Sequence, residues 1–320
     1  MRRRILCREY SPGRSRRSEL KPELSRDVSL KQFTTFRCGG EAKLFAEPKT
    51  EDEVAELLDY ARSECLRTFV MGQGSNILVS DKGFDGLVIR IGRQLGAISS
   101  MIDGSGMTVS AGAGAPMSLL GNTAARQGLT GAEFMCGIPG SVGGGVFMNA
   151  GAYGDSLSDI AVNVRYSDGE KILTRTVNEC GFGYRTSLFE KMDRDGRTAV
   201  ILGLTVKLDK ENQETIDERI AQLREKRAAS QPLDIPSAGS TFKRPEGYFA
   251  GKLIEDSGLR GFKLDDSGAQ VSPKHCGFIV NNGGRAKSAD ILRLIDYVVA
   301  TVYEKQGVML EREVRLIGEF

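Results

Sequence analysis

The chain of 320 residues contains no tryptophan and a single histidine, His275. A lone histidine excludes metal sites built from several histidines, and any Ser–His–Asp triad would have to use it. The six cysteines include no CxxC pair, which argues against a zinc site and predicts reduced thiols instead of a disulfide framework. Acid–base chemistry therefore falls to serine, tyrosine, lysine, cysteine or carboxylate side chains, or to a cofactor.

The chain also lacks a dominant charge and a long apolar run. Its net charge is +2, so no overall field attracts nucleic acid, and aromatic residues make up only 7%, which argues against a stacking platform for single strands. No apolar stretch approaches the ~20 residues needed to span a bilayer. We therefore expect neither a nucleic-acid partner nor a membrane partner, and the cysteine pattern predicts a cytoplasmic protein.

The N-terminus is basic, with Arg2–Arg4 followed by Arg14, Arg16 and Arg17. No apolar segment follows the arginine pair, so a secretory or twin-arginine signal is unsupported. We expect residues 1–29 to be a disordered basic extension.

Glycine is abundant, and its placement is the most informative feature of the chain. Residues 137–154 contain seven glycines mixed with apolar side chains, and a shorter glycine segment, Gly72–Asn76, lies between two apolar runs. Glycine lets backbone N–H groups approach a ligand closely, and successive N–H groups form anion-binding concavities. Neither segment matches a P-loop or a Rossmann fingerprint. Together they predict a ligand with a diphosphate and a large flat group, although a tight turn is the alternative for each loop alone.

Periodicity and caps predict a mixed α/β chain. The expected helices span 51–64, Pro116 to Gly128, 210–230 and 249–257, with a last one from Ser288 as N-cap to Gly307 as C-cap; the expected strands span 69–71, 77–79, 87–91, 107–110, 171–177, 200–208 and 313–317. Composition shifts near residue 209, where a charged, glycine-free stretch begins. We place a boundary there, between an α+β part that holds both glycine loops and a smaller α/β part.

Six motifs occur in a fixed order: Gly72–Asn76, Gly137–Gly144, Asn149–Gly154, Tyr184–Ser187, Ala238–Lys243 and Glu311–Arg315. From about residue 30 to 320, this series resembles the UDP-N-acetylenolpyruvoylglucosamine reductase (MurB) family, flavoenzymes of peptidoglycan precursor synthesis. The resemblance implies an α+β fold. A two-subdomain FAD-binding region of the vanillyl-alcohol-oxidase (PCMH) type would occupy 30–210, divided near 82, and a substrate-binding domain would occupy 211–320. A monomer is expected.

The resemblance also implies the ligands and their contacts. NADPH would be the hydride donor, and no metal is expected. The residues that match cofactor-binding positions are Gly72, Gly74, Ser75, Asn76, Gly137, Ile138, Pro139, Gly140, Ser141, Gly143, Gly144, Asn149, Gly151 and Tyr153. Those assigned to substrate binding are Tyr184, Lys226, Lys243, Arg244 and Lys252, and Arg227 is a further basic residue that could offset the UDP diphosphate.

Three matched positions carry the chemistry that the resemblance implies. Hydride would pass from flavin N5 to carbon 3 of UDP-N-acetylglucosamine enolpyruvate, and Ser240 would protonate carbon 2 to give UDP-N-acetylmuramate. Arg185 and Glu313 would act on the substrate carboxylate and the developing enolate. A guanidinium engages a carboxylate bidentately, and a glutamic acid with a raised pKa could donate to the same oxygens. Serine is a feasible acid only when it is well placed against a strongly basic carbanion-like centre.

Other interpretations stay open from the residues alone. Ser240 could be a loop serine, Arg185 and Glu313 a surface ion pair, and the lysines and arginines a solvated basic face. His275 is expected to be structural. The chain passes directly from the strand ending near 208 into the next helix, so it resembles the shorter subclass without a tyrosine-bearing lid insertion, and Arg244 stands where other members have asparagine. The alternative functions are a flavin oxidase or dehydrogenase of a hydroxy acid or sugar alcohol, and a non-enzymatic nucleotide-binding protein.

Overall fold

The structure, a computed structural model, describes residues 22–103 and 106–320. Residues 1–21 of the expected basic extension lie outside the described residues. The expectation that the extension reaches residue 29 is wrong, because Ser25–Ser29 forms strand β1 and pairs antiparallel with β2 (Glu41–Ala46). Regular structure therefore begins before the first of the sequence motifs.

The first sheet has the strand order β1-β2-β5-β3, with β5 at Phe84–Arg90 and β3 at Thr68–Met71. β2 and β3 both run parallel to β5, and helix α1 (Glu51–Ser63) connects them. α1 begins as predicted, since the Thr50 hydroxyl accepts a hydrogen bond from the Glu53 N–H at 3.2 Å. It buries Val54, Leu57, Leu58 and Ala61, which recur at helical spacing.

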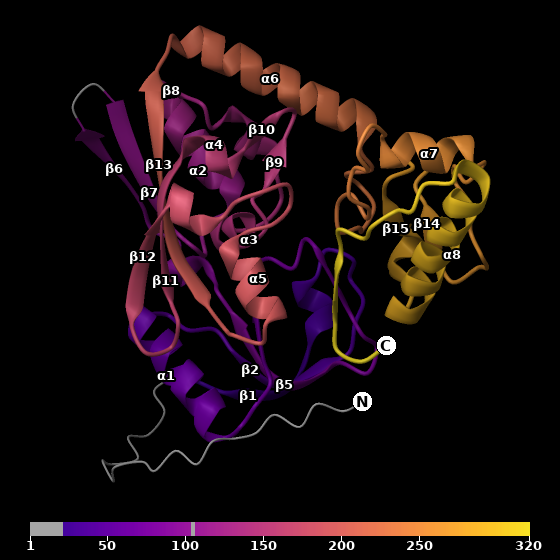
Figure 1. Ribbon diagram of the computed structural model, residues 1–320, viewed down its shortest axis with the longest axis horizontal. Coiled ribbons are helices and arrows are strands. Elements are labelled where there is room, and N and C mark those ends of the chain that lie inside the picture. Colours follow the sequence, from indigo (N-terminus) through magenta and orange to yellow (C-terminus); the bar gives the residue numbers. More distant parts are fainter. Residues whose placement is uncertain (1–21, 104–105) are drawn as a thin grey trace.

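The second sheet is antiparallel. Most of the helices of the sheet-containing part, which comprises both sheets and their helices, lie on one face of this sheet (Figure 1). Its strands are β12 (Ile172–Thr176), β11 (Ala161–Ser167), β13 (Val200–Lys210), β7 (Gly106–Gly112) and β6 (Ile98–Asp103), in that order, and β8 (Leu129–Thr130) pairs with the end of β13. The associated helices are α2 (Met117–Arg126), α3 (Val142–Phe147), α4 (Leu157–Ile160) and α5 (Leu188–Arg194), with a small hairpin of β9 (Gly151–Ala152) and β10 (Asp155–Ser156). One continuous core joins both sheets through residues such as Leu57, Leu87, Val109 and Leu204.

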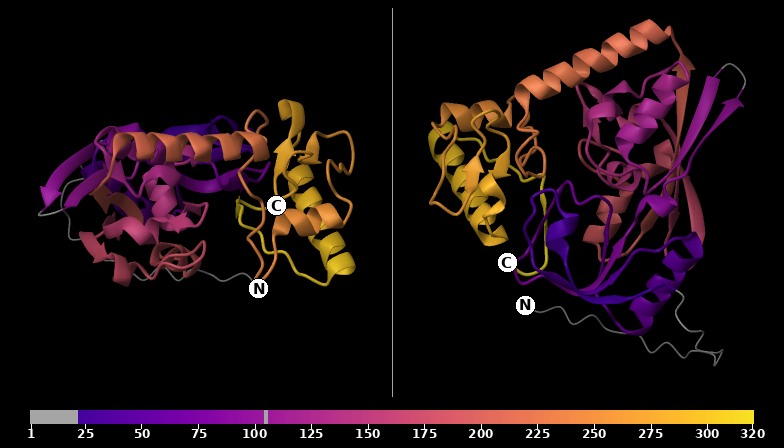
Figure 2. Two further views of the ribbon diagram at one scale, coloured as in Figure 1. Left: turned by 90° about the horizontal axis from the view of Figure 1, so that it is seen from above. Right: turned by 180° about the vertical axis from the view of Figure 1, so that it is seen from behind.

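Helix α6 (Gln213–Ser230) follows β13 after two residues, so no inserted lid segment lies between them. In Figures 1 and 2 it runs along one side of the molecule, from the sheet-containing part to the C-terminal part. Only Ile216 and Ile220 of this helix are buried, and Arg219 forms an ion pair with the buried Glu133 at 2.7 Å. α6 is thus anchored by its first half and exposed along much of its second half.

The C-terminal part consists of α7 (Ala250–Asp256), the paired strands β14 (Ala269–Val271) and β15 (Ile279–Asn281), and α8 (Ser288–Gln306). The predicted N-cap of α8 is wrong by one residue: Lys287 is the N-cap and Ser288 is the first helical residue. The Asp81 carboxylate, from the N-terminal part, accepts hydrogen bonds from the N–H groups of Ser288 and Ala289 at 2.9 Å each. Gly307 ends the helix in a left-handed conformation, as predicted.

The last strand does not stay with the C-terminal part. β16 (Arg315–Ile317) pairs parallel with β4 (Ile77–Val79), directly after the first glycine loop. The predicted strand began at residue 313, whereas in the structure Glu313 precedes β16. The chain therefore leaves the sheet-containing part through α6 and returns to it through β16.

The expectation of reduced cysteines is confirmed for Cys38, Cys136, Cys180 and Cys276, which are free thiols. It is wrong for Cys65, which is disulfide-bonded. Within the ranges that the structure describes, no helix combines the length and the apolar character needed to cross a membrane.

Candidate active site

A cavity of about 650 Å³ lies between the sheet-containing part and the C-terminal part. Its wall combines both glycine loops, the turn that carries Arg185, the segment that carries Ser240, and Glu313. Residues far apart in the sequence therefore line one cavity.

The two glycine loops lie against each other. The Ser75 hydroxyl donates to the Pro139 carbonyl at 3.1 Å, and a Cβ added at Gly72 would lie 2.0 Å from the Ser141 hydroxyl oxygen. Gly140 has a φ of 129°, which side chains rarely adopt, and a Cβ there would lie 2.9 Å from the Ser75 hydroxyl. The absence of side chains is what allows this close approach.

Most residues predicted to contact the cofactor line this cavity. They are Gly72, Gly74, Ser75, Asn76, Ile138, Pro139, Gly140, Ser141, Gly143, Gly144, Gly151 and Tyr153. Gly137 and Asn149 are not among its lining residues. Gly137 faces Arg227, and Asn149 is buried, with its amide hydrogen-bonded to Gly183 and Ser158.

Arg185 is at the tip of a tight turn, Gly183–Thr186, and has a φ of 54°. Its Nε donates to Glu313 Oε1 at 3.0 Å, and its Nη2 donates to the Gly151 carbonyl at 2.9 Å. The side chains are only 20% and 11% exposed, so solvent screens this ion pair less than a surface pair. Because both Nε and Nη2 make hydrogen bonds, the guanidinium is held in one orientation.

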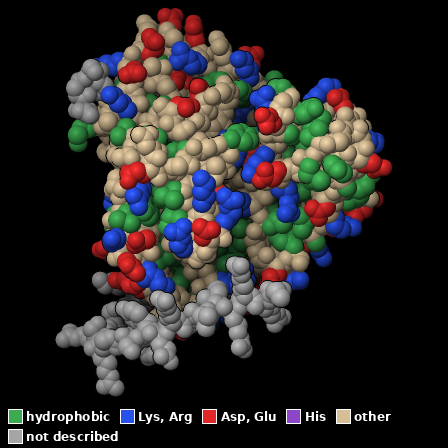
Figure 3. Space-filling model, viewed as in Figure 1, with side chains coloured by type: hydrophobic (Ala, Val, Ile, Leu, Met, Phe, Trp, Pro, Cys, Tyr) green, Lys and Arg blue, Asp and Glu red, His purple; other side chains and the backbone are tan. Residues whose placement is uncertain are grey.

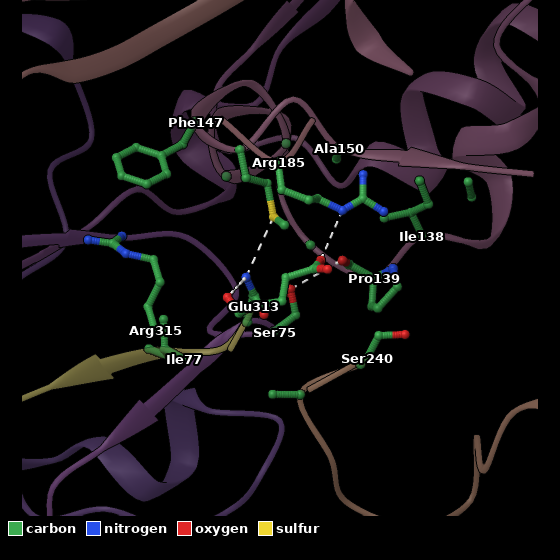
Figure 4. A pocket seen from close by; sticks show the side chains of 18 of the residues that line it. Ser75, Ile77, Ile138, Pro139, Phe147, Ala150, Arg185, Ser240, Glu313 and Arg315 are labelled. Carbon is green, nitrogen blue, oxygen red and sulfur yellow. Dashed lines mark hydrogen bonds and ion pairs between the residues drawn. The ribbon is translucent and has the colours of Figure 1, made fainter. Parts of the chain in front are cut away.

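Glu313 reaches the cavity because its segment pairs with the segment that follows Ser240. The Glu313 N–H donates to the Thr241 carbonyl, and the Lys243 N–H donates to the Glu311 carbonyl, both at 2.8 Å. The Asn76 side chain donates to the Glu313 carbonyl at 3.1 Å and thereby links this segment to the first glycine loop. Figure 4 shows Arg185 and Glu313 meeting from different segments, with Ser240 on a third.

Burial raises the pKa of Glu313, although Arg185 and, more weakly, Lys243 act to lower it. The net direction is upward because removing a carboxylate from water disfavours its charged form more than this one guanidinium favours it. Glu313 therefore keeps its proton to higher pH than an exposed glutamate and can donate to an anionic oxygen.

Ser240 is exposed to the cavity, while its neighbour Thr241 is fully buried. The Thr241 N–H donates to the Gly277 carbonyl at 2.8 Å, and its hydroxyl accepts from the Ile279 N–H at 3.0 Å. This anchoring fixes the backbone next to Ser240, so the serine hydroxyl projects from a rigid position into the cavity.

Three of the five predicted substrate contacts line the cavity: Tyr184, Arg244 and Lys252. The Tyr184 hydroxyl accepts a hydrogen bond from the Arg244 N–H at 3.0 Å, which links the two parts of the molecule across the cavity mouth. The other two do not line it, since Lys226 is exposed on α6 and the Lys243 ammonium pairs with Glu311 at 2.5 Å.

Three further arginines line the cavity, and of these Arg315 and Arg260 were missed as site residues, whereas Arg227 was among the basic residues expected near the UDP diphosphate. Arg227 is half-buried and makes no ion pair with any residue that the structure describes, and burial lowers its pKa. Arg315 pairs with Asp193 at 2.7 Å, and its guanidinium lies 4.4 Å from the Phe147 ring centre. The position of Arg315 two residues after Glu313 in an extended segment was a usable indication, because residues i and i+2 share a face.

Further basic side chains, Arg260 and Lys274, line the cavity on the side of the C-terminal part. On the face shown in Figure 3, lysine and arginine side chains gather near the junction of the two parts. His275 also lines the cavity; its Nδ1 accepts from the Gly277 N–H at 3.1 Å, and burial lowers its pKa. This environment is suited to phosphate groups and contains a neutral imidazole.

Comparison with known proteins identifies two matching families. Residues 42–171 match the FAD binding domain family, and residues 231–317 match the C-terminal domain of UDP-N-acetylenolpyruvoylglucosamine reductase. The order of these matches confirms the predicted fold class, an FAD-binding region followed by a smaller C-terminal domain.

Curated relatives match almost the whole chain. The UDP-N-acetylenolpyruvoylglucosamine reductase of Agathobacter rectalis is 45% identical over 307 residues, covering 93% of this chain and 95% of that protein. The enzymes of the same name from Clostridioides difficile and Caldanaerobacter subterraneus are 43% and 42% identical and cover 93% and 91% of this chain. The crystal structure of the Thermus caldophilus reductase is 33% identical and superposes with a TM-score of 0.75, covering 93% of this chain and 99% of that one.

Proposed function

This chain belongs to the UDP-N-acetylenolpyruvoylglucosamine reductase family, and from that premise we propose that it reduces UDP-N-acetylglucosamine enolpyruvate to UDP-N-acetylmuramate, with NADPH as reductant and FAD as cofactor. One observation supports this function above all others. Ser240, Arg185 and Glu313 come from three segments and all line the cavity that holds both glycine loops, where Arg185 contacts Glu313.

The cavity fits a flavin dinucleotide. Backbone and small residues form the wall along both glycine loops, which leaves room for a flat ring system and presents N–H groups to a diphosphate. Arg227 adds a half-buried guanidinium without a counter-ion among the described residues. FAD, when bound, supplies the hydride transfer between NADPH and the enolpyruvyl group.

Ser240 is proposed to give the proton to carbon 2. Its hydroxyl is presented to the cavity by a backbone that Thr241 anchors, and such placement compensates for the weak acidity of a serine. Arg185 and Glu313 are proposed to hold the substrate carboxylate. The oriented guanidinium offers charge-assisted donors, and a protonated Glu313 donates to the charge that develops during reduction.

We also propose how the chain is organised for this reaction. Residues 30–210 would bind FAD and residues 211–320 the nucleotide sugar, with Tyr184 of the first part meeting Arg244 of the second. A monomer suffices, because one chain supplies all three proposed catalytic residues. The reaction would take place in the cytoplasm, without a nucleic-acid or membrane partner.

The test is NADPH oxidation by the purified, flavin-loaded protein, started by adding UDP-N-acetylglucosamine enolpyruvate. Oxidation that depends on this substrate is expected. Ser240→Ala should keep flavin binding and flavin reduction by NADPH while product formation falls by at least about 100-fold, the usual contribution of a positioned proton donor.

Normal turnover by Ser240→Ala would reject the serine as proton donor while leaving the reductase activity in place. Turnover of a hydroxy acid or sugar alcohol with oxygen, without reduction of the enolpyruvyl substrate, would instead support an oxidase on the same fold.

A further inference from the structure

The last residue of helix α3 and the segment that follows it hold the turn that carries Arg185 at three points. The Ser187 hydroxyl donates to the Phe147 carbonyl at 2.6 Å, the Asn149 amide donates to the Gly183 carbonyl at 3.1 Å, and Arg185 Nη2 donates to the Gly151 carbonyl at 2.9 Å. The contacts fall at residues 147, 149 and 151, so one short segment faces the whole turn. α3 itself begins in the second glycine loop.

Asn149 is the only one of the three gripping residues whose side chain supplies the contact from the α3 side. Its side chain is buried, with the residue 6% exposed. Its Oδ1 accepts from the Ser158 N–H at 3.0 Å, while its Nδ2 donates both to the Gly183 carbonyl and to the Ser158 hydroxyl at 3.2 Å. The partners determine the orientation of the amide, because only the NH₂ group can meet a carbonyl.

The turn needs such support. Arg185 has a φ of 54°, a left-handed conformation that is unfavourable for a residue with a side chain. Within the turn, the Gly183 and Thr186 backbones exchange hydrogen bonds of 3.1 and 3.3 Å. The Gly183 carbonyl therefore accepts from both the Thr186 N–H and Asn149, and Asn149 ties the turn to the rest of the protein.

We propose that Asn149 is a positioning residue: its amide holds the Gly183–Thr186 turn so that Arg185 meets Glu313 and the substrate carboxylate. This inference rests on the proposed function, since it concerns the placement of Arg185. It replaces the cofactor contact expected for Asn149 from the resemblance. Through α3, it also couples the second glycine loop to the group that binds the carboxylate.

Two substitutions distinguish the role of the Asn149 side chain from that of its backbone conformation. Asn149 has a φ of 46°, which glycine adopts without strain, so Asn149→Gly removes the amide and leaves the backbone unstrained. Asn149→Asp keeps an acceptor for the Ser158 N–H but removes the donor to Gly183. Asn282→Asp is the matched control, because it changes a half-buried amide that donates to Gln270 at 3.1 Å, away from the cavity.

Both Asn149 variants should keep flavin affinity within about twofold while kcat falls by about tenfold, as expected for one lost hydrogen bond. A freed Arg185 no longer lowers the pKa of Glu313, so the limb of the kcat/KM pH profile that depends on Glu313 should move to higher pH. Hydrogen exchange at the Thr186 amide should become faster. The Asn282 variant should show none of these changes.

A loss of flavin affinity in proportion to activity would overturn the proposal and return Asn149 to the cofactor site. An unchanged pH profile with unchanged Thr186 exchange would overturn it as well. If the parent protein does not reduce the enolpyruvyl substrate, the proposed function fails, and Thr186 exchange alone then decides whether Asn149 holds the turn.

Discussion

At the residue scale, the proposed chemistry depends on one buried acid whose environment opposes ionisation. Glu313 is 11% exposed and faces a guanidinium 3.0 Å away, yet burial outweighs that partner and raises its pKa. A carboxyl group of this kind stays protonated where surface carboxylates are charged. It can therefore serve as a hydrogen-bond donor to an anionic substrate.

Glu313→Gln should remove the pH dependence that this group imposes. The wild-type protein loses the protonated form as pH rises through the raised pKa, so its kcat/KM should fall on the alkaline side; the glutamine keeps an N–H donor and cannot ionise, so this limb should disappear. We expect kcat to fall by about tenfold, since an amide is a weaker donor than an acid. Persistence of the limb in the variant would assign it to another group.

The same shift affects stability in a defined direction. The folded-state pKa of Glu313 lies above its unfolded value. Its contribution to the free energy of unfolding is therefore present at low pH and is lost as pH rises through the folded pKa. The free energy of unfolding of the wild-type protein should therefore fall over this window relative to Glu313→Gln. Chemical denaturation at a series of pH values measures the difference.

At the element scale, α6 shows how helical register selects a functional side chain. Its anchored first half buries Ile216 and Ile220, and this fixes the rotation of the second half. Arg227 then lines the cavity, while the adjacent Lys226 is exposed. Successive residues on a helix differ by about 100° in direction, so neighbours in sequence face different surroundings.

Arg227→Met should weaken binding of a diphosphate by about tenfold, because it keeps an apolar stem and removes a cation that has no counter-ion among the described residues. Flavin fluorescence titration measures the effect on the cofactor, and the KM for the UDP-sugar measures the effect on the substrate. The measurement that changes shows whether Arg227 faces the diphosphate of the cofactor or that of the UDP-sugar. Lys226→Met is the adjacent comparison and should change neither; no change in either measurement for Arg227→Met would contradict an anion-binding role.

At the scale of the whole molecule, the C-terminal strand closes the structure around the cavity. β16 pairs with β4, Ile317 is 6% exposed, and its carbonyl accepts from the Ser80 N–H at 2.7 Å. Glu313 lies just before this strand, and Arg315 within it reaches Asp193. The pairing of β16 with β4 thus positions Glu313 and Arg315, which line the cavity.

Deleting residues 315–320 should lower the melting temperature and release the flavin. The deletion exposes β4 and removes a buried isoleucine, whose burial alone contributes about 1.5–3 kcal/mol. Differential scanning calorimetry and retained flavin absorbance report the two effects.

Deleting Phe320 alone is the control for that truncation, because this residue is 41% exposed. Ile317→Ala tests the same strand without shortening the chain and should cost about 2–5 kcal/mol. Full flavin retention by the truncated protein would show that β16 does not support the site.

Local patterns predicted the elements that depend on local physics. The N-cap and apolar spacing of α1 and the glycine C-cap of α8 could be predicted, because each of these interactions spans only a few residues. α3 was not predicted as a helix, since three of its six residues are glycine and its intrinsic propensity is low. It forms because Ser141 caps it and Gly145 allows close packing against Met117.

The sequence by itself determined the chemical inventory: two glycine loops, the serine, arginine and glutamate that match catalytic positions in six ordered motifs, and a lone histidine that excludes metal sites built from several histidines. Only the tertiary structure decided that Arg227 and not Lys226 faces the cavity, that Asn149 is buried behind Arg185, and that β16 returns to β4. The physical reason is distance along the chain. Arg185 and Glu313 are 128 positions apart, and their meeting depends on how sheets, helices and caps pack together, which no local periodicity records.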